Sequence, residues 1–81
     1  MSSHQWFDAA LARQLALHLL ISAFEVPKRR VVAMQRRSRE AINRGLRTID
    51  SRRACPVFDQ QYETMVERAQ TLLAEQFALA A

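Results

Sequence analysis

The sequence predicts an all-α protein of three helices that form a single domain over residues 1–81. Glycine occurs once and proline twice, whereas Ala, Leu, Gln, Arg and Glu dominate, and this composition favours helices. Apolar residues recur at steps of three and four, with no competing alternation typical of strands. Pro27 and Pro56 divide the chain into three helical segments, which we expect to form a small bundle or hairpin.

The first helix is expected over residues 4–24, with Ser2 or Ser3 as its N-cap and Asp8 in its first turns. It cannot continue through Val26, because a following proline disfavours the helical conformation. The helix is apolar around most of its circumference. Its polar line is formed by Gln14, His18, Ser22 and Glu25.

This apolar excess predicts a homodimer. A helix that is apolar on most sides is buried on most sides, and two neighbours in a three-helix chain cover only part of it. A second copy is the simplest source of the missing surface, since two-fold dimers are the commonest oligomer. The alternative is a monomeric bundle with this helix at its centre. The expected dimer face comprises Trp6, Leu17, Leu20 and Phe24, on a heptad line with Ala10.

The second helix is expected over residues 28–49 and carries most of the charge. Lys28 to Arg53 hold ten cations and two acids, so the net charge is −1 over residues 1–27, +8 over 28–53 and −3 over 54–81. The apolar stripe of this helix is thin, and its arginines face away from Ile42. The predicted binding ridge consists of Arg30, Arg37, Arg44 and Arg47, flanked by Arg29 and Arg36.

Three interpretations of this ridge compete: a solvated face, a phosphate-binding surface, and a surface that docks on an acidic patch of another protein. Exposed ion pairs stabilise a fold by only about 0–1 kcal/mol, and aligned like charges repel, so we expect a binding role. Ala41 and Gly45 have the spacing of a helix-turn-helix unit, but Glu40 and Arg44 then occupy positions that should be apolar. Sequence-specific DNA readout is therefore not expected, and non-specific nucleic-acid binding remains the alternative.

The third helix is expected over residues 57–79, started by Pro56 and with Asp59 in its first turn or as its cap. It is clearly amphipathic, because apolar residues follow the helical period and acids occupy the opposite side. The apolar side comprises Phe58, Tyr62, Met65, Val66, Ala69, Leu72, Leu73 and Phe77.

No catalytic, cofactor-binding or metal-ligating pattern accompanies these helices, and we expect neither an enzyme nor a cofactor. Cys55 is the one cysteine, and neither histidine has a cysteine partner at zinc-ligand spacing. His18 could pair with Glu25, but a histidine among leucines is more often a hydrogen-bonded core residue. The apolar run Leu15–Phe24 is too short to cross a membrane, and the lack of disulfides suits the cytoplasm.

The join of the apolar and basic helices, LALHLLISAFEVPKRR, resembles small proteins made early by temperate phages of Gram-negative bacteria. Members of this group are helical host-takeover inhibitors that block a type IV pilus assembly ATPase or a quorum-sensing transcriptional activator. The resemblance covers roughly Ala9 to Ile49 and rests on size, composition and this join, so no functional residue is transferred. The resemblance implies a dimeric, non-enzymatic helical protein that disables a bacterial target by binding it. From the ridge we expect the target surface to be acidic, and we expect the location to be the cytoplasm of the bacterial host cell.

Overall fold

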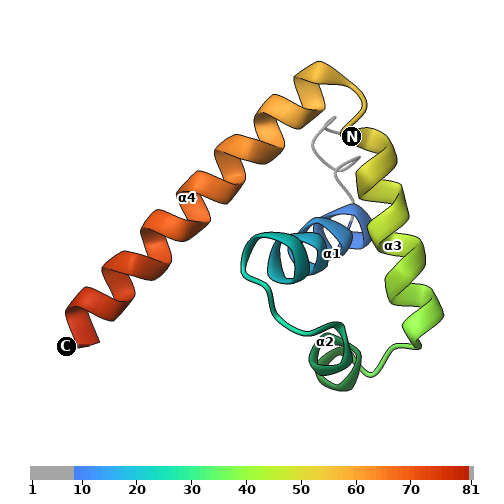
Figure 1. Ribbon diagram of the computed structural model, residues 1–81, viewed down its shortest axis with the longest axis horizontal. Helices are drawn as coiled ribbons and strands as arrows, with labels where there is room; N and C mark the ends of the chain where they lie inside the picture. Colours follow the sequence, from blue (N-terminus) through green and yellow to red (C-terminus); the bar gives the residue numbers. More distant parts are fainter. Residues whose placement is uncertain (1–8, 81) are drawn as a thin grey trace. The chain divides into compact units, whose positions relative to one another are not determined.

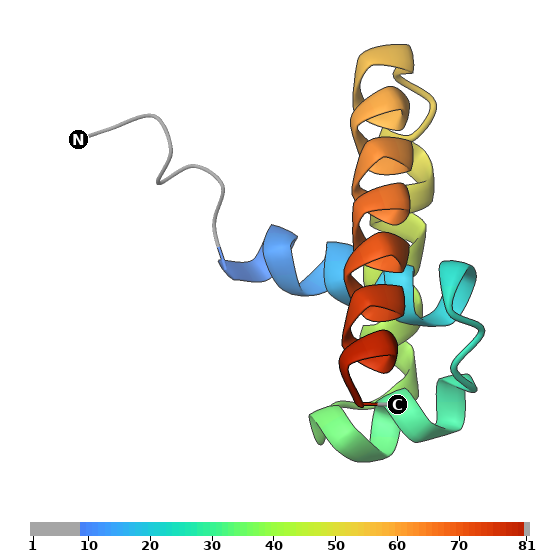
Figure 2. The same ribbon diagram turned by 90° about the vertical axis from the view of Figure 1, so that its left-hand side faces the viewer.

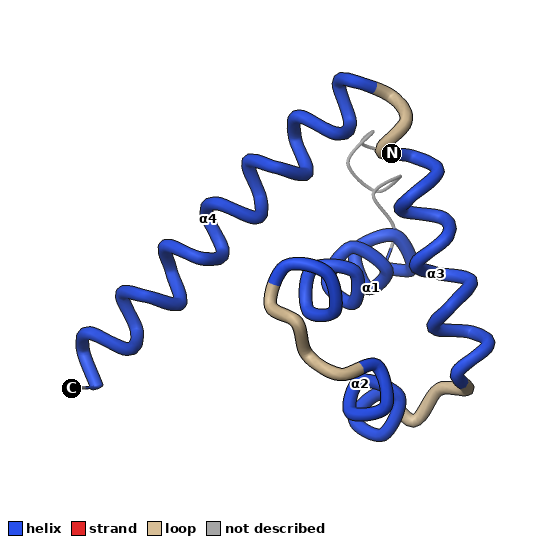
Figure 3. The backbone as a smooth tube through the Cα atoms, in the orientation of Figure 1, coloured by secondary structure: helices blue, strands red, loops and turns tan. Residues whose placement is uncertain are grey.

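The computed structural model describes residues 9–80, and every regular element in this range is helical (Figures 1 and 3). The all-α prediction is confirmed. The predicted N-terminal features, from Ser2 to Asp8 and including Trp6, lie outside the described residues. The chain forms two compact units that divide between Ser51 and Arg52, where the sequence predicted one domain. The elements are α1 (Ala9–His18), the π-helix η2 (Leu19–Ala23), α2 (Lys28–Gln35), α3 (Arg39–Arg52) and α4 (Pro56–Ala80).

The first predicted helix is present as α1 followed directly by η2, and it ends before Pro27 as expected. Its end is closed by two backbone hydrogen bonds, in which Phe24 N–H donates to Leu19 O (3.1 Å) and Val26 N–H donates to Leu20 O (2.9 Å). Glu25 between them takes the left-handed conformation, with φ of 56°. A left-handed residue at the end of a helix is a common way to turn the chain so that following N–H groups satisfy the last carbonyls.

The second predicted helix is not continuous, so the prediction of three helices was wrong. Arg36 adopts a left-handed conformation (φ 53°) and ends α2 after Gln35. Ser38 then starts α3, because its Oγ accepts a hydrogen bond from Ala41 N–H (3.0 Å), which is the N-cap arrangement. Residues 36–38 are therefore a turn. In Figure 1, α2 is seen nearly end-on while α3 runs along the page, so the two helices cross.

One residue from each of α1, α2 and α3 contributes to a buried cluster in the first unit. Leu17 of α1, Val31 of α2 and Ile42 of α3 are 5%, 0% and 1% exposed and pack together. Half-buried apolar residues surround them: Ile21, Val26, Val32 and Leu46. Complete burial of such a side chain stabilises a fold by about 1.5–3 kcal/mol, so these three contacts hold the helices against one another.

This core takes Leu17 out of the predicted dimer face. Leu17 lies in the chain's own core, and Leu20 and Phe24 are already half-buried. The physical reason is the turn at residues 36–38. Because the chain folds back there, the basic segment forms two helices that pack on α1. The sequence predicted only one helix in this segment.

The second unit consists of the end of α3, the connection and α4, which starts at Pro56 with Asp59 in its first turn, as predicted. Figure 2 shows α4 as one uninterrupted helix. Tyr62 is buried, whereas every residue from Thr71 to Ala80 is exposed. Among the described helices, none combines the length and the apolar character needed to cross a bilayer.

Candidate nucleic-acid interface

Contacts with α1 fix how α3 sits in the first unit. Gly45 is buried at the crossing, and a Cβ added there would lie 3.2 Å from Gln14 Cγ. Near the end of α3, Asp50 Oδ1 lies 2.7 Å from His18 Nε2. Gly45 thus allows α1 and α3 to pack closely, and its contact with Gln14 and the His18–Asp50 contact together set the rotation of α3 about its axis.

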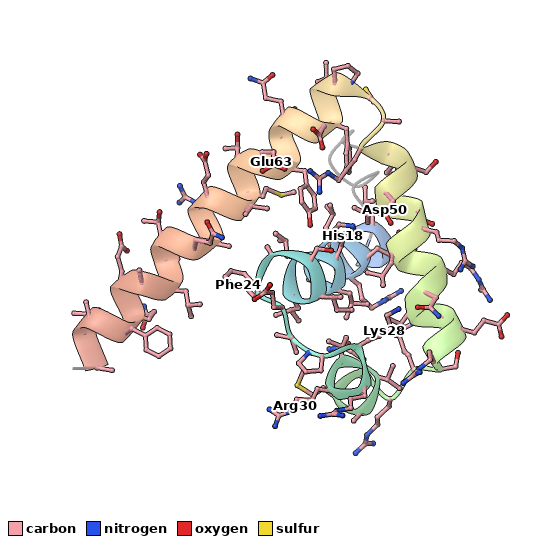
Figure 4. The ribbon with its side chains drawn as sticks, in the orientation of Figure 1. His18, Phe24, Lys28, Arg30, Asp50 and Glu63 are labelled. Carbon is pink, nitrogen blue, oxygen red and sulfur yellow. The ribbon has the colours of Figure 1, made fainter. Side chains whose placement is uncertain are left out.

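His18 is a core residue rather than part of a catalytic pair. Its side chain is 4% exposed and bonds to Asp50, whose side chain is 68% exposed. The prediction of a packed, hydrogen-bonded histidine is confirmed, but the suspected partner Glu25 was wrong. Glu25 lies in the left-handed turn after η2, while the fold brings Asp50 to His18 from the opposite end of the basic segment (Figure 4).

With its inner face fixed, α3 presents a charged outer face. Ile42, Gly45 and Ile49 are buried on one side. Glu40, Arg44 and Arg47 are exposed on the other side at steps of four and three, so they form one line along the helix. Exposed Arg39 and half-buried Asn43 lie beside this line in the first two turns. We call Arg39, Glu40, Asn43, Arg44 and Arg47 the α3 face.

The predicted ridge is divided by the turn. Arg30 lies on α2, Arg37 in the turn, and Arg44 and Arg47 on α3. All four are exposed, as are Arg29 and Arg36, and none of them is ion-paired to an acid within residues 9–80. The expectation that they point to solvent is confirmed, but the seven-residue spacing does not align them, because no single helix contains all four.

Sequence reasoning missed Arg39 and Asn43 as members of the site. Both fall in the first turns of α3, and a helix boundary at Ser38 was needed to see this. The signal was present, because a serine followed closely by Glu40 is typical of a helix N-terminus.

Arg53 belongs to the second unit and is engaged there. Its guanidinium donates to Asp59 Oδ1 and to Glu63 Oε1, each at 2.5 Å, and lies 4.3 Å from the centre of the Tyr62 ring. The hydrogen bond with Asp59 raises the pKa of Arg53 above its usual value. Arg53 therefore anchors the start of α4 and is not part of the α3 face, although the sequence counts it in the basic segment.

No metal or nucleophile chemistry accompanies the α3 face. Within the described part of the chain, no three His, Cys, Asp or Glu side chains gather as a metal site would require. Cys55 is exposed and free in the connection before α4. Apart from Glu40, the α3 face consists of cationic and hydrogen-bonding side chains on one helix, which are the side-chain types of a binding surface.

Comparison with protein-family models, with curated proteins and with solved structures finds no match to this chain.

Proposed function

We propose that residues 28–52 form a helix-turn-helix unit that binds duplex DNA, with α3 in the major groove. The observation that carries the proposal is the turn at residues 36–38, which joins two crossing helices packed on α1 through Leu17, Val31 and Ile42. A short turn between two packed helices, the second of them exposed along its outer face, is the arrangement of this class of DNA-binding unit.

The chemistry of the α3 face agrees with this role. In helix-turn-helix units, side chains near the N-terminus of the second helix contact base edges. Arginine makes paired hydrogen bonds with guanine and asparagine with adenine, and the first turns of α3 carry Arg39, Asn43 and Arg44. Arg29, Arg30, Arg36 and Arg37 add positive charge on α2 and the turn, where the phosphate backbone would supply sequence-independent affinity.

The objection raised by the sequence no longer applies. That objection assumed a helix-turn-helix unit with its turn at Gly45, which put Glu40 and Arg44 at positions that should be buried. With the turn at residues 36–38, the inward positions are occupied by Val31, Ile42 and Gly45, all of which are buried. Glu40 and Arg44 then fall on the outer face, and Pro56 lies beyond the end of α3.

Docking of the same arginines on an acidic protein surface remains the second interpretation, and the phage-inhibitor resemblance belongs to it. A cytoplasmic location suits both. DNA is favoured because the turn, the crossing helices and the placement of Asn43 together match the geometry of groove binding, whereas docking on an acidic patch needs only exposed cations. An enzyme is not part of the proposal.

The test is fluorescence anisotropy of the full chain with a labelled random duplex, followed by selection of bound sequences. Binding at micromolar protein is expected, and four phosphate contacts would give a slope of log K against log salt of about −3.6. Asn43→Ala should weaken discrimination between selected and random duplexes by about tenfold, since a good paired contact is worth about 1–3 kcal/mol.

Asn43→Ala leaves the net charge unchanged, so its effect cannot come from lost electrostatic attraction. Gln60→Ala on α4 is the matched neutral control and should bind like the original chain. Absence of any complex at low salt would refute DNA binding and favour the protein-docking interpretation. Binding that Asn43→Ala leaves fully selective would refute the groove geometry.

A further inference from the structure

The C-terminal half of α4 carries exposed apolar side chains that no described residue of its own unit covers. Leu72, Leu73, Phe77 and Leu79 are 49%, 45%, 69% and 80% exposed. They lie within two turns of one another on a single helix. Soluble proteins rarely leave such a contiguous apolar patch open to water, and exposed patches of this kind mark interaction sites.

The spacing along α4 identifies the kind of partner. Residues 58, 62, 65, 69, 72, 76 and 79 follow steps of four and three, and all except Gln76 are apolar or aromatic. This is the heptad repeat of a helix that packs against another helix, with residues 62, 69 and 76 at a positions and residues 58, 65, 72 and 79 at d positions. Tyr62 is buried within the chain, so the available seam runs from Met65 to Leu79.

The charges favour a second copy of α4 in antiparallel orientation. Arg68 and Glu75 both occupy g positions, and in an antiparallel helix pair each g position faces a g position of the partner. With Ala69 of one copy opposite Leu72 of the other, Arg68 of each copy lies opposite Glu75 of the other. A parallel pair would place Arg68 opposite Leu73, since g then faces e.

The apolar flank supports the same register. Val66 and Leu73 both occupy e positions, which face each other in an antiparallel pair, and Phe77 widens the stripe on that side. In this register Val66 of one copy lies opposite Leu73 of the other. The small Ala69 meets the larger Leu72 twice about the two-fold axis. A single helix therefore complements itself in charge, size and polarity, which is the requirement for a symmetric dimer interface.

We propose that the protein is a homodimer held by an antiparallel pair of α4 helices, with its seam from Met65 to Leu79. The homodimer predicted from the sequence is thus assigned to α4 instead of the first helix. If the proposed DNA binding also holds, a two-fold dimer carries two α3 faces, and the selected DNA sites should be inverted repeats.

Sedimentation equilibrium of the full chain without DNA tests the dimer. A mass of twice 9.3 kDa is expected at micromolar concentrations. Leu72→Asp should shift the chain to monomer with unchanged helical circular dichroism, because Leu72 is exposed in the single chain. Val57→Asp, which also charges an exposed apolar residue of α4 but lies off the seam, should stay dimeric.

The register is tested by exchanging the two charges. Arg68→Glu and Glu75→Arg should each weaken the dimer at least threefold, and the double variant should restore it. A monomeric original chain, or a Leu72→Asp variant as dimeric as Val57→Asp, would overturn the α4 interface. Failure of the double variant to restore the dimer would overturn the antiparallel register. A monomer that binds duplex DNA refutes this inference alone, whereas a dimer that does not bind refutes only the proposed function.

Discussion

Ile42 is the residue at which the packing of the first unit can be tested most directly. It is 1% exposed and is the contribution of α3 to the cluster that joins α1, α2 and α3. Ile42→Ala removes three carbon atoms. Transfer alone accounts for about 2.4 kcal/mol at 0.8 kcal/mol per carbon, and the remaining cavity raises the expected loss to about 3–4 kcal/mol.

A loss of this size would remove most of the free energy of unfolding, because domains this small are stable by only about 3–5 kcal/mol. Ile42→Val is therefore the quantitative variant, with an expected loss of about 0.5–1.5 kcal/mol. Urea denaturation followed by circular dichroism gives both values. Met34→Ala on α2 also removes three heavy atoms, but Met34 is 60% exposed, so a change within about 0.5 kcal/mol is expected. Equal losses for Ile42→Ala and Met34→Ala would show that α3 does not pack as described.

Three further predictions concern the turn and the contact between α1 and α3, and the same denaturation assay measures all of them. Ser38→Ala should destabilise the first unit by about 1 kcal/mol through loss of the N-cap, whereas Ser38→Gly should lose only a few tenths; equal effects would contradict the cap. Arg36→Gly should be neutral or stabilising by up to about 1 kcal/mol because it relieves a left-handed conformation, and Arg36→Val should be destabilising; the reverse order would contradict that geometry. His18→Ala should cost about 2–3 kcal/mol and Asp50→Asn less than about 1 kcal/mol, since only the histidine is buried; a larger loss from Asp50→Asn would contradict this difference.

The sequence predicted helices where local signals agree. Pro27 and Pro56 give clear boundaries, and the structure starts α2 and α4 at or directly after them. The turn at residues 36–38 has a weaker signal. Arg36 takes a left-handed conformation, which glycine adopts more readily than any other residue. Ser38 has the spacing of the apolar stripe, but its side chain acts as the N-cap of α3. Hydrophobic periodicity alone cannot distinguish one continuous helix from two helices joined by a turn, because the spacing from Val31 to Ile42 fits both.

The same turn explains why the candidate site could be predicted only in part. Solvent exposure of Arg44 and Arg47 follows from their positions opposite Ile42 within one helix, and helical periodicity is sufficient to predict it. The position of Arg30 relative to Arg44 depends on the angle at which α2 and α3 cross. This angle is set by tertiary packing, and the local sequence does not reveal it. The partner of His18 was missed for the same reason, because Asp50 is 32 residues away in the sequence.

The distribution of charge is consistent with separate roles for the two units. The net charge is +5 over the first unit (residues 1–51) and −3 over α4 (residues 56–80), so phosphates would attract the first unit and repel α4. An acidic helix is poorly suited to lie along DNA, yet α4 bears the largest exposed apolar side chains of the described residues. Apolar association depends little on salt, whereas phosphate contacts weaken steeply as salt rises. The two proposed interactions therefore rest on different physical forces and on different helices, so loss of either leaves the other measurable.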